Sequence, residues 1–143
     1  MGRISNILHT KGKIIYSVTP DTIVYSALEV MFEKNISALL VMENNYPVGI
    51  FTERDYARNV ELKGKSSREI RIDSVMTKNL ITVSPDNTIE EAMRLMTTKF
   101  IRHLPVVDEN TLLGIISIGD VVKYVIEEQK FIIGNLESYI TGT

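Results

Sequence analysis

The spacing of apolar residues predicts a chain of short helices and strands. Residues 4–11 carry apolar side chains at helical spacing and Gly12 follows, so we expect an amphipathic helix that ends near this glycine. A strand is expected over 14–18, and next a helix that begins with the cap residues 19–22 and ends near Asn35. Apolar residues at helical spacing are predicted to be buried in that helix: Val24, Ala27, Leu28, Met31 and Phe32.

The next segments predict a pair of strands, a helix and a connector. Apolar runs at 38–42 and 48–51 flank a polar turn, which favours two buried strands in a hairpin. We expect a helix that starts after Thr52 and reaches about Leu62, an exposed connector over 63–67, which is rich in Lys, Ser and Gly, and one helical turn over 73–76.

The same order then recurs because the chain contains a duplication. Moving residues 18–58 forward by 65 positions places them on 83–123 without a gap, and 13 of these 41 positions are identical. The elements expected in the second copy are a strand over 80–83, a helix over 85–99, strands over 103–107 and 113–117, and a helix from 118 through 138, with a break at Gly134 left open. Two copies of one unit usually pack together, so we expect an α/β (α+β) fold with two small mixed sheets.

Composition and charge narrow the possible functions. With 143 residues, 44% apolar and 24% charged, the chain has the size and composition of one globular domain made of two halves. A net charge of −2 disfavours sequence-independent nucleic-acid binding. The lack of cysteine excludes disulfides and thiolate sites and favours a cytoplasmic location. No apolar stretch approaches the ~18 residues of a membrane span, so no membrane association is expected.

Each copy ends with the same motif, a glycine followed after three residues by a hydroxyl and after three more by an aspartate. We call Gly49–Asp55 the first motif and Gly114–Asp120 the second motif. A helix start stabilises an anion such as phosphate through its backbone N–H groups and dipole, and the hydroxyl adds a donor. A carboxylate only accepts hydrogen bonds, so the aspartate suits paired donors such as a ribose diol.

The same residues also fit a structural role. Thr52 with Asp55, and Ser117 with Asp120, have the spacing of a capping box, which stabilises a helix start without any ligand. Thr88–Glu91 has this spacing too, and we assign it only a capping role. Duplication copies caps as readily as sites, so both interpretations of the motifs remain open.

Together these features resemble a tandem pair of CBS (cystathionine-β-synthase) domains over about 14–124. The segments that carry the resemblance are Thr19–Asp21 and Ser84–Asp86, Ser37–Val41 and Arg102–Val106, and the two motifs. The chain is more narrowly similar to stand-alone bacterial and archaeal CBS-pair signal-transduction proteins. The resemblance implies two β-α-β-β-α repeats related by a pseudo-twofold axis, with two clefts that bind adenosine ligands. AMP is our first choice, and ADP, ATP, NAD or S-adenosylmethionine are the others.

The resemblance also implies roles for individual residues, since in the family the motif aspartate holds the ribose and the motif hydroxyl lies near the phosphate. The residues carried over to the first cleft are Thr52 and Asp55, Arg102 and His103 for the phosphates, and Pro105 beside the adenine. The residues carried over to the other cleft are Ser117, Asp120, Thr22 and Ala27.

The two copies differ in charge. Where the second copy has Arg102–Pro105, the first has Ser37–Leu40, which lacks the cations and the proline of the family pattern. Arg54 adds a cation to the first motif, although an exposed charge on a helix is the alternative interpretation. An anionic ligand is therefore expected to prefer the Asp55 cleft.

We expect a non-catalytic regulatory module that binds an adenosine nucleotide, with a ligand-free interaction or dimerisation module as the alternative. An enzyme is not expected because no base lies beside a nucleophile, and a metal site is not expected because His9 and His103 lack further ligands at suitable spacing. The expected organisation is an N-terminal helix over 1–13, repeats over 14–70 and 71–127, and a helical tail over 128–143.

The tail carries an apolar set that the repeats do not need: Phe131, Ile132, Ile133, Leu136, Tyr139 and Ile140. We expect it to lie across a second copy in a homodimer, or against the chain's own N-terminal helix. The effector protein that would respond is unknown.

Overall fold

The computed structural model describes residues 2–12 and 14–142, which divide into two compact units. Unit 1 contains the described residues of 1–13, 82–108 and 113–143, and unit 2 contains those of 14–81 and 109–112. The second copy of the duplication thus lies mainly in unit 1 and the first copy in unit 2. No helix within the described residues is both long and apolar enough to cross a membrane.

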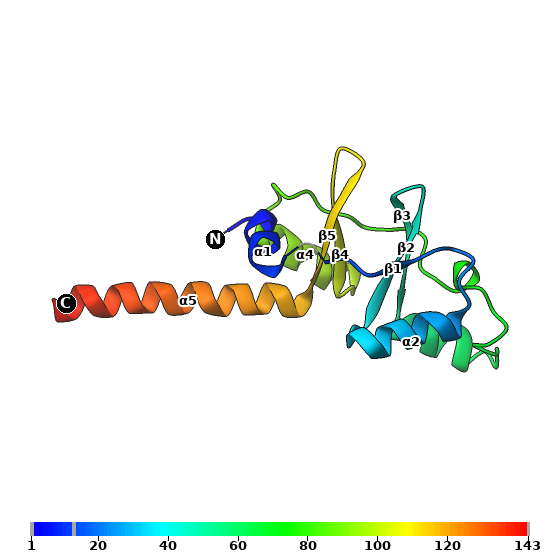
Figure 1. The fold of residues 1–143 in the computed structure, drawn as a ribbon. Coiled ribbons are helices and arrows are strands. Elements are labelled where there is room, and N and C mark those ends of the chain that lie inside the picture. Colours follow the sequence, from blue (N-terminus) through cyan, green and yellow to red (C-terminus); the bar gives the residue numbers. More distant parts are fainter. Residues whose placement is uncertain (1, 13, 143) are drawn as a thin grey trace. The chain divides into compact units, whose positions relative to one another are not determined.

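Unit 2 is built on a three-stranded sheet with the strand order β1-β2-β3 (Figure 1). Its elements are β1 (Ser17–Val18), α2 (Val24–Lys34), β2 (Ala38–Glu43), β3 (Tyr46–Thr52), α3 (Glu53–Tyr56), the π-helix η1 (Ala57–Glu61) and the 3₁₀ turn η2 (Ile72–Ser74). β1 runs parallel to β2, and β3 runs antiparallel to β2 as the predicted hairpin requires. The expected mixed α+β architecture with small sheets is confirmed.

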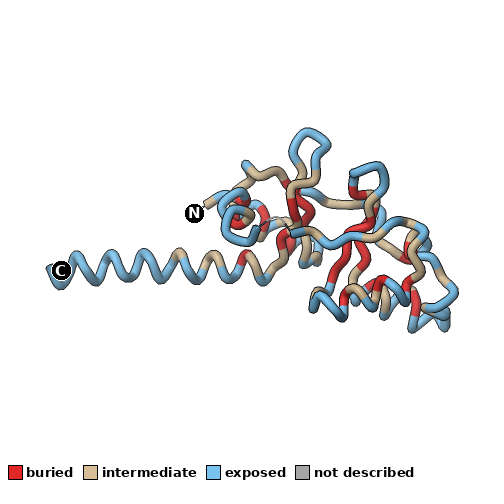
Figure 2. The backbone as a smooth tube through the Cα atoms, in the orientation of Figure 1, coloured by how far each residue is buried: buried red, intermediate tan, exposed pale blue. Residues whose placement is uncertain are grey.

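The core of unit 2 lies between the sheet and its helices (Figure 2). Fully buried apolar residues from α2, β2, β3 and the segments after them form one cluster: Val24, Ala27, Met31, Leu39, Val41, Phe51, Val60, Ile72 and Val75. The prediction for Phe32 was wrong, because this side chain is 88% exposed. Side chains of adjacent helical residues point about 100° apart. Because Met31 points into the core, Phe32 points toward solvent.

Unit 1 repeats the arrangement with a smaller sheet. Its elements are α1 (Ile4–Lys11), α4 (Ile89–Lys99), β4 (His103–Asp108), β5 (Thr111–Ser117) and α5 (Ile118–Thr141). β4 and β5 pair with each other, and Val83 adds one parallel bridge to Val106. α1 ends at Lys11 with Gly12 as its C-cap, as predicted.

Several element boundaries differ from the predictions. Only Ser17–Val18 of the strand expected over 14–18 is formed, and the strand expected over 80–83 is reduced to the Val83 bridge. The missing residues, 14–16 and 80–82, lie at the N-terminal ends of the predicted strands, whereas both strands end where predicted, two residues before Pro20 and Pro85. The helices that follow begin at Val24 and Ile89, later than predicted.

One helix continues differently from the prediction, and for another the structure decides whether it breaks at Gly134. The helix after Thr52 is α-helical only to Tyr56 and then becomes the π-helix η1, which wraps one extra residue into its turn. α5 passes through Gly134 without a break, because a single glycine weakens a helix by only about 0.5 to 1 kcal/mol.

Candidate functional site

The first motif places its hydroxyl and carboxylate where β3 passes into α3. The Asp55 N–H donates to Thr52 Oγ1 over 3.1 Å, and the Thr52 N–H donates to Asp55 Oδ2 over 3.0 Å. The Thr77 hydroxyl donates to the other carboxylate oxygen, Oδ1, over 3.1 Å. Asp55 is only 9% exposed, and it is the one buried charged residue within the described chain. Its carboxylate is thus held from both sides by donors of its own unit.

The second motif has the same local geometry where β5 passes into α5. The Asp120 N–H donates to Ser117 Oγ over 3.1 Å, and the Ser117 N–H donates to Asp120 Oδ2 over 2.8 Å. Here the additional donor is a cation, since Lys11 Nζ lies 2.6 Å from Asp120 Oδ2. Both motifs therefore form capping boxes, as does Thr88 with Glu91, in agreement with the sequence spacing.

The backbone donors at these helix starts are partly used within each unit. The Glu53 N–H donates to the Ser37 carbonyl over 3.1 Å, and the matched Ile118 N–H donates to the Arg102 carbonyl over 2.8 Å. Since the third N–H of each helix is taken by the motif hydroxyl, an anion would find fewer free donors than a bare helix start offers. Cationic side chains would then supply most of the attraction for a phosphate.

Each motif is packed against a segment that lies outside the duplicated positions. In unit 2, the Ile72 N–H donates to the Thr22 carbonyl over 2.8 Å, and in unit 1 the Ile4 N–H donates to the Asn87 carbonyl over 2.9 Å. The motif glycines pack directly against these segments. A Cβ on Gly49 would lie 2.4 Å from Met76 Sδ, and one on Gly114 would lie 2.8 Å from a Leu8 methyl.

Beyond these contacts the two segments diverge. After Met76 the chain is extended, and Thr77 pairs with Ile50 through two main-chain hydrogen bonds of 2.9 and 3.0 Å. After Leu8 the chain stays helical, so no such bridge forms. Lys11 Nζ instead donates to the carbonyl of Ile115, the match of Ile50, over 2.7 Å. One ammonium group thus replaces both the amide and the hydroxyl of Thr77.

The charges around the second motif shift two pKa values. Burial acts to raise the pKa of Asp120, but the hydrogen bond from Lys11, the Ser117 hydrogen bonds and the Lys11 charge together hold it below its ordinary value. Burial lowers the pKa of His103, and the cations Lys11 and Arg102 lower it further, against the opposing attraction of Asp120. His103, Lys11 and Asp120 therefore form one charge cluster in unit 1.

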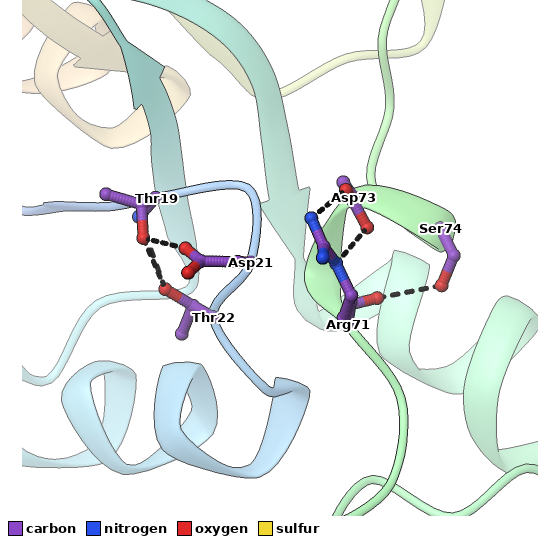
Figure 3. Close-up of polar contacts among 6 residues, drawn as sticks. All are labelled: Thr19, Asp21, Thr22, Arg71, Asp73 and Ser74. Carbon is purple, nitrogen blue, oxygen red and sulfur yellow. Dashed lines mark hydrogen bonds and ion pairs between the residues drawn. The ribbon is translucent and has the colours of Figure 1, made fainter.

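The structure distributes the other predicted site residues between the two units. Arg54 lies on α3 with an exposed side chain, Arg102 is exposed, and Pro105 is buried in β4. Thr22 belongs to a polar turn in which its hydroxyl contacts that of Thr19, which also donates to Asp21 (Figure 3). Ala27 is fully buried in the core of unit 2.

Sequence reasoning missed the two groups that contact the motif carboxylates, Thr77 and Lys11. Thr77 lies 22 positions after Asp55, and Lys11 lies 109 positions before Asp120, so no local spacing points to either contact. Within the described residues, no group of three or more His, Cys, Asp or Glu side chains is placed to hold a metal ion.

Comparison with known proteins shows that the sequence matches a family model and related proteins. The family model for the CBS domain matches the chain twice, over residues 8–61 and 72–127. The CBS domain-containing protein CBSX3, mitochondrial, from Arabidopsis thaliana is 39% identical over 149 residues, which cover 97% of this chain and 72% of that protein.

Solved structures share the fold. A candidate signal-transduction protein with CBS domains from Burkholderia ambifaria MC40-6 is 45% identical with a TM-score of 0.85, covering 89% of this chain and 96% of that one. The CBS domain pair of protein MJ0100, in complex with 5′-methylthioadenosine and S-adenosyl-L-methionine, is 23% identical with a TM-score of 0.78. It covers 90% of this chain and 98% of that one, and at this identity the likeness concerns the fold alone.

Proposed function

This chain belongs to the CBS domain family, and we propose that it is a non-catalytic regulatory module that binds an adenosine nucleotide, AMP first among the candidates. One observation carries the proposal. The same hydroxyl and carboxylate stand at both strand-to-helix junctions, and hydrogen bonds hold Asp55 and Asp120 in matched positions. A fixed carboxylate that only accepts hydrogen bonds suits the diol of a ribose.

We propose that the first motif is the stronger site. The group beside Asp55 is the neutral Thr77 hydroxyl, which a sugar hydroxyl can replace with one donor for another. Asp120 is instead engaged in an ion pair with Lys11. Arg54 and Arg102 are the proposed phosphate-binding cations, His103 is a proposed hydrogen-bond donor to the phosphate, and Pro105, Thr22 and Ala27 are the proposed wall positions.

The choice among AMP, ADP, ATP, NAD and S-adenosylmethionine is part of the proposal. The fold as such accommodates adenosine derivatives, because the CBS pair of MJ0100 is seen with two of them. AMP is preferred because it combines the diol with a single phosphate, which the few available backbone donors and cations can match.

A melting-temperature screen against these five ligands tests the proposal. Ligand at about 100 times its dissociation constant should stabilise the fold by roughly 2.7 kcal/mol. Asp55→Ala should remove the stabilisation, and Asp120→Ala should have a smaller effect on it. The reverse order would contradict our ranking of the motifs, and no response to any of the five would contradict nucleotide binding.

We also propose that the chain forms a homodimer through the tail of α5. From Gln129 onward, every described residue of this helix is exposed, so the chain's own N-terminal helix does not cover the tail. Apolar side chains recur along α5 with alternating steps of four and three residues, which is the spacing that partner helices bury. This seam consists of Ile118, Val122, Val125, Ile132, Leu136 and Tyr139, with the polar Gln129 at one position of the repeat and with Ile126, Ile133 and Ile140 beside it.

Sedimentation measurements over a range of concentrations test the dimer. Leu136→Glu puts a charge into the seam and should shift the protein toward the monomer. Ser138→Glu adds the same charge in the same tail but off the seam, so it should leave the mass unchanged. A wild-type protein that stays monomeric at high concentration would contradict this interface.

The alternative function is an interaction module that binds no nucleotide. It is favoured by one observation, that both motif carboxylates already accept hydrogen bonds within complete capping boxes and from Thr77 or Lys11. This alternative predicts no thermal response to any nucleotide, while removal of either cap still destabilises the protein. An effector protein that reads the bound state and a cytoplasmic location stay predictions from the sequence.

A further inference from the structure

Both motif carboxylates contact a side-chain donor, but only the donor at the first motif, Thr77, belongs to a residue whose main chain is itself bonded to the motif strand. Thr77 is held at Asp55 by two main-chain hydrogen bonds to Ile50, so its hydroxyl stays in place as long as the bridge does. Lys11 reaches Asp120 and the Ile115 carbonyl only through its ammonium group. The contact at the second motif can therefore break by rotation of one flexible side chain.

We infer that Lys11 is the specificity-determining residue of the second motif and locks it against sugar hydroxyls in the resting protein. The inference rests on the proposed function, because it assigns the lock to the same carboxylate that would hold a ribose. Lys11 Nζ stands 2.6 Å from Asp120 Oδ2. A ribose hydroxyl must compete there with an ammonium group, which pairs its charge with the carboxylate in addition to donating a hydrogen bond.

The lock can open without loss of α1. The helix is anchored by its other end, where Ile4 and Ile7 are buried and the Ile4 N–H donates to the Asn87 carbonyl. Leu8 packs against Gly114 and adds a further contact. The Lys11 side chain is 34% exposed, so its released ammonium can move into water without crossing the core.

The lock determines how many ligands each chain binds. While Lys11 stays on Asp120, only the first motif accepts a nucleotide, and each chain binds one ligand at moderate concentrations. A chain that lacks the ammonium binds a second ligand at Asp120. The two copies of the duplication thus differ in occupancy although their motif residues match.

Calorimetric titration with AMP tests the lock in the full chain. The wild type should show one binding event per chain, and Lys11→Met should show two, the second at least tenfold tighter than any second event in the wild type. Lys11→Arg keeps the charge and should retain one event. Lys63→Met removes the same charge from the exposed connector over 63–67 and should also retain one event.

The double variant Lys11→Met with Asp120→Ala should return to a single event, which assigns the gained site to Asp120. One event in both the wild type and Lys11→Met, or a second event that survives the double variant, would overturn the lock and leave the proposed function standing. Failure of the wild type and of every variant to bind AMP, with no response to the other four ligands, would overturn both. Should Asp120→Ala alone prevent folding, Asp120→Asn serves in its place.

Discussion

The two motifs share their junction geometry and differ in the group that contacts the carboxylate. Asp55 and Asp120 each cap a helix with a hydroxyl three residues before them, at hydrogen-bond distances between 2.8 and 3.1 Å. Thr77 closes the first and Lys11 the second, and both lie outside the 41 duplicated positions. Duplication has copied the helix start. The neighbouring segments add a neutral hydroxyl beside the first carboxylate and a cation beside the second.

Replacing the motif glycines should give the largest effect and sharpen the comparison. Gly49→Ala places a Cβ against three atoms of Met76, the nearest at 2.4 Å, so we expect a loss of about 1 to 3 kcal/mol, typical of overpacking. Gly114→Ala meets only one methyl of Leu8, a mobile end, and should cost less than about 1 kcal/mol. Urea unfolding of both variants measures the difference. Equal costs would show that the two segments pack equally tightly.

Removing either helix cap should destabilise the protein to a similar extent, which tests whether the two junctions are equivalent. Thr52→Ala and Ser117→Ala each remove the acceptor of one helix N–H, so each should lower the free energy of unfolding by about 0.5 to 2 kcal/mol. Thermal unfolding of the ligand-free variants measures this. As a control, Thr141→Ala at the far end of α5 removes a hydroxyl that caps no helix start. A loss at only one cap would break the equivalence of the junctions.

The groups that contact the carboxylates should differ in their contribution to stability. Thr77→Val keeps the shape and removes one hydrogen bond to the buried Asp55, so a loss of about 0.5 to 1.5 kcal/mol is expected. Lys11→Met breaks a partly exposed pair and should cost only about 0.2 to 1 kcal/mol. High salt should shrink the Lys11 effect and leave the Thr77 effect unchanged, which chemical denaturation with and without added salt measures.

The smallest expected effect is the pH dependence of stability that His103 in unit 1 contributes. The pKa of His103 is lowered in the folded state by burial and by Lys11 and Arg102. The unfolded chain therefore takes up a proton near pH 6.5 before the folded chain does. Stability should be complete above about pH 6.5 and should fall as the pH drops toward the lower folded-state pKa. His103→Gln should flatten this part of the stability curve, measured as melting temperature against pH, whereas His9→Gln should not.

The sequence was sufficient for the parts of the fold that depend on local pattern. The hairpins, the helix ends at Asn35 and Gly12 and the capping boxes follow from residues within a few positions of one another. The strands before Pro20 and Pro85 were overestimated, because an apolar run does not determine how many of its residues pair with the neighbouring strand. The burial of Phe32 was wrongly predicted because helical spacing gives a face but not its edges.

At the candidate site, the motif residues were predictable and their contacts were not. The spacing of hydroxyl and carboxylate encodes the capping geometry of Thr52 and Asp55 directly. The contact of Lys11 with Asp120 joins residues 109 positions apart, and it exists only because α1 remains helical for one turn beyond Leu8. Such a contact depends on tertiary packing, which a single sequence does not report.

One feature of α5 links the second motif to a distant surface. The helix carries Asp120 in its first turn and is 24 residues long without a break, a total length of about 36 Å at a rise of roughly 1.5 Å per residue. A stiff rod hinged at one end amplifies motion in proportion to its length. At this length, a tilt of about 10° at the base would move the tip by about 6 Å. A small displacement at Asp120 would thus become a displacement at the tip that is large enough to change a contact with a neighbouring molecule.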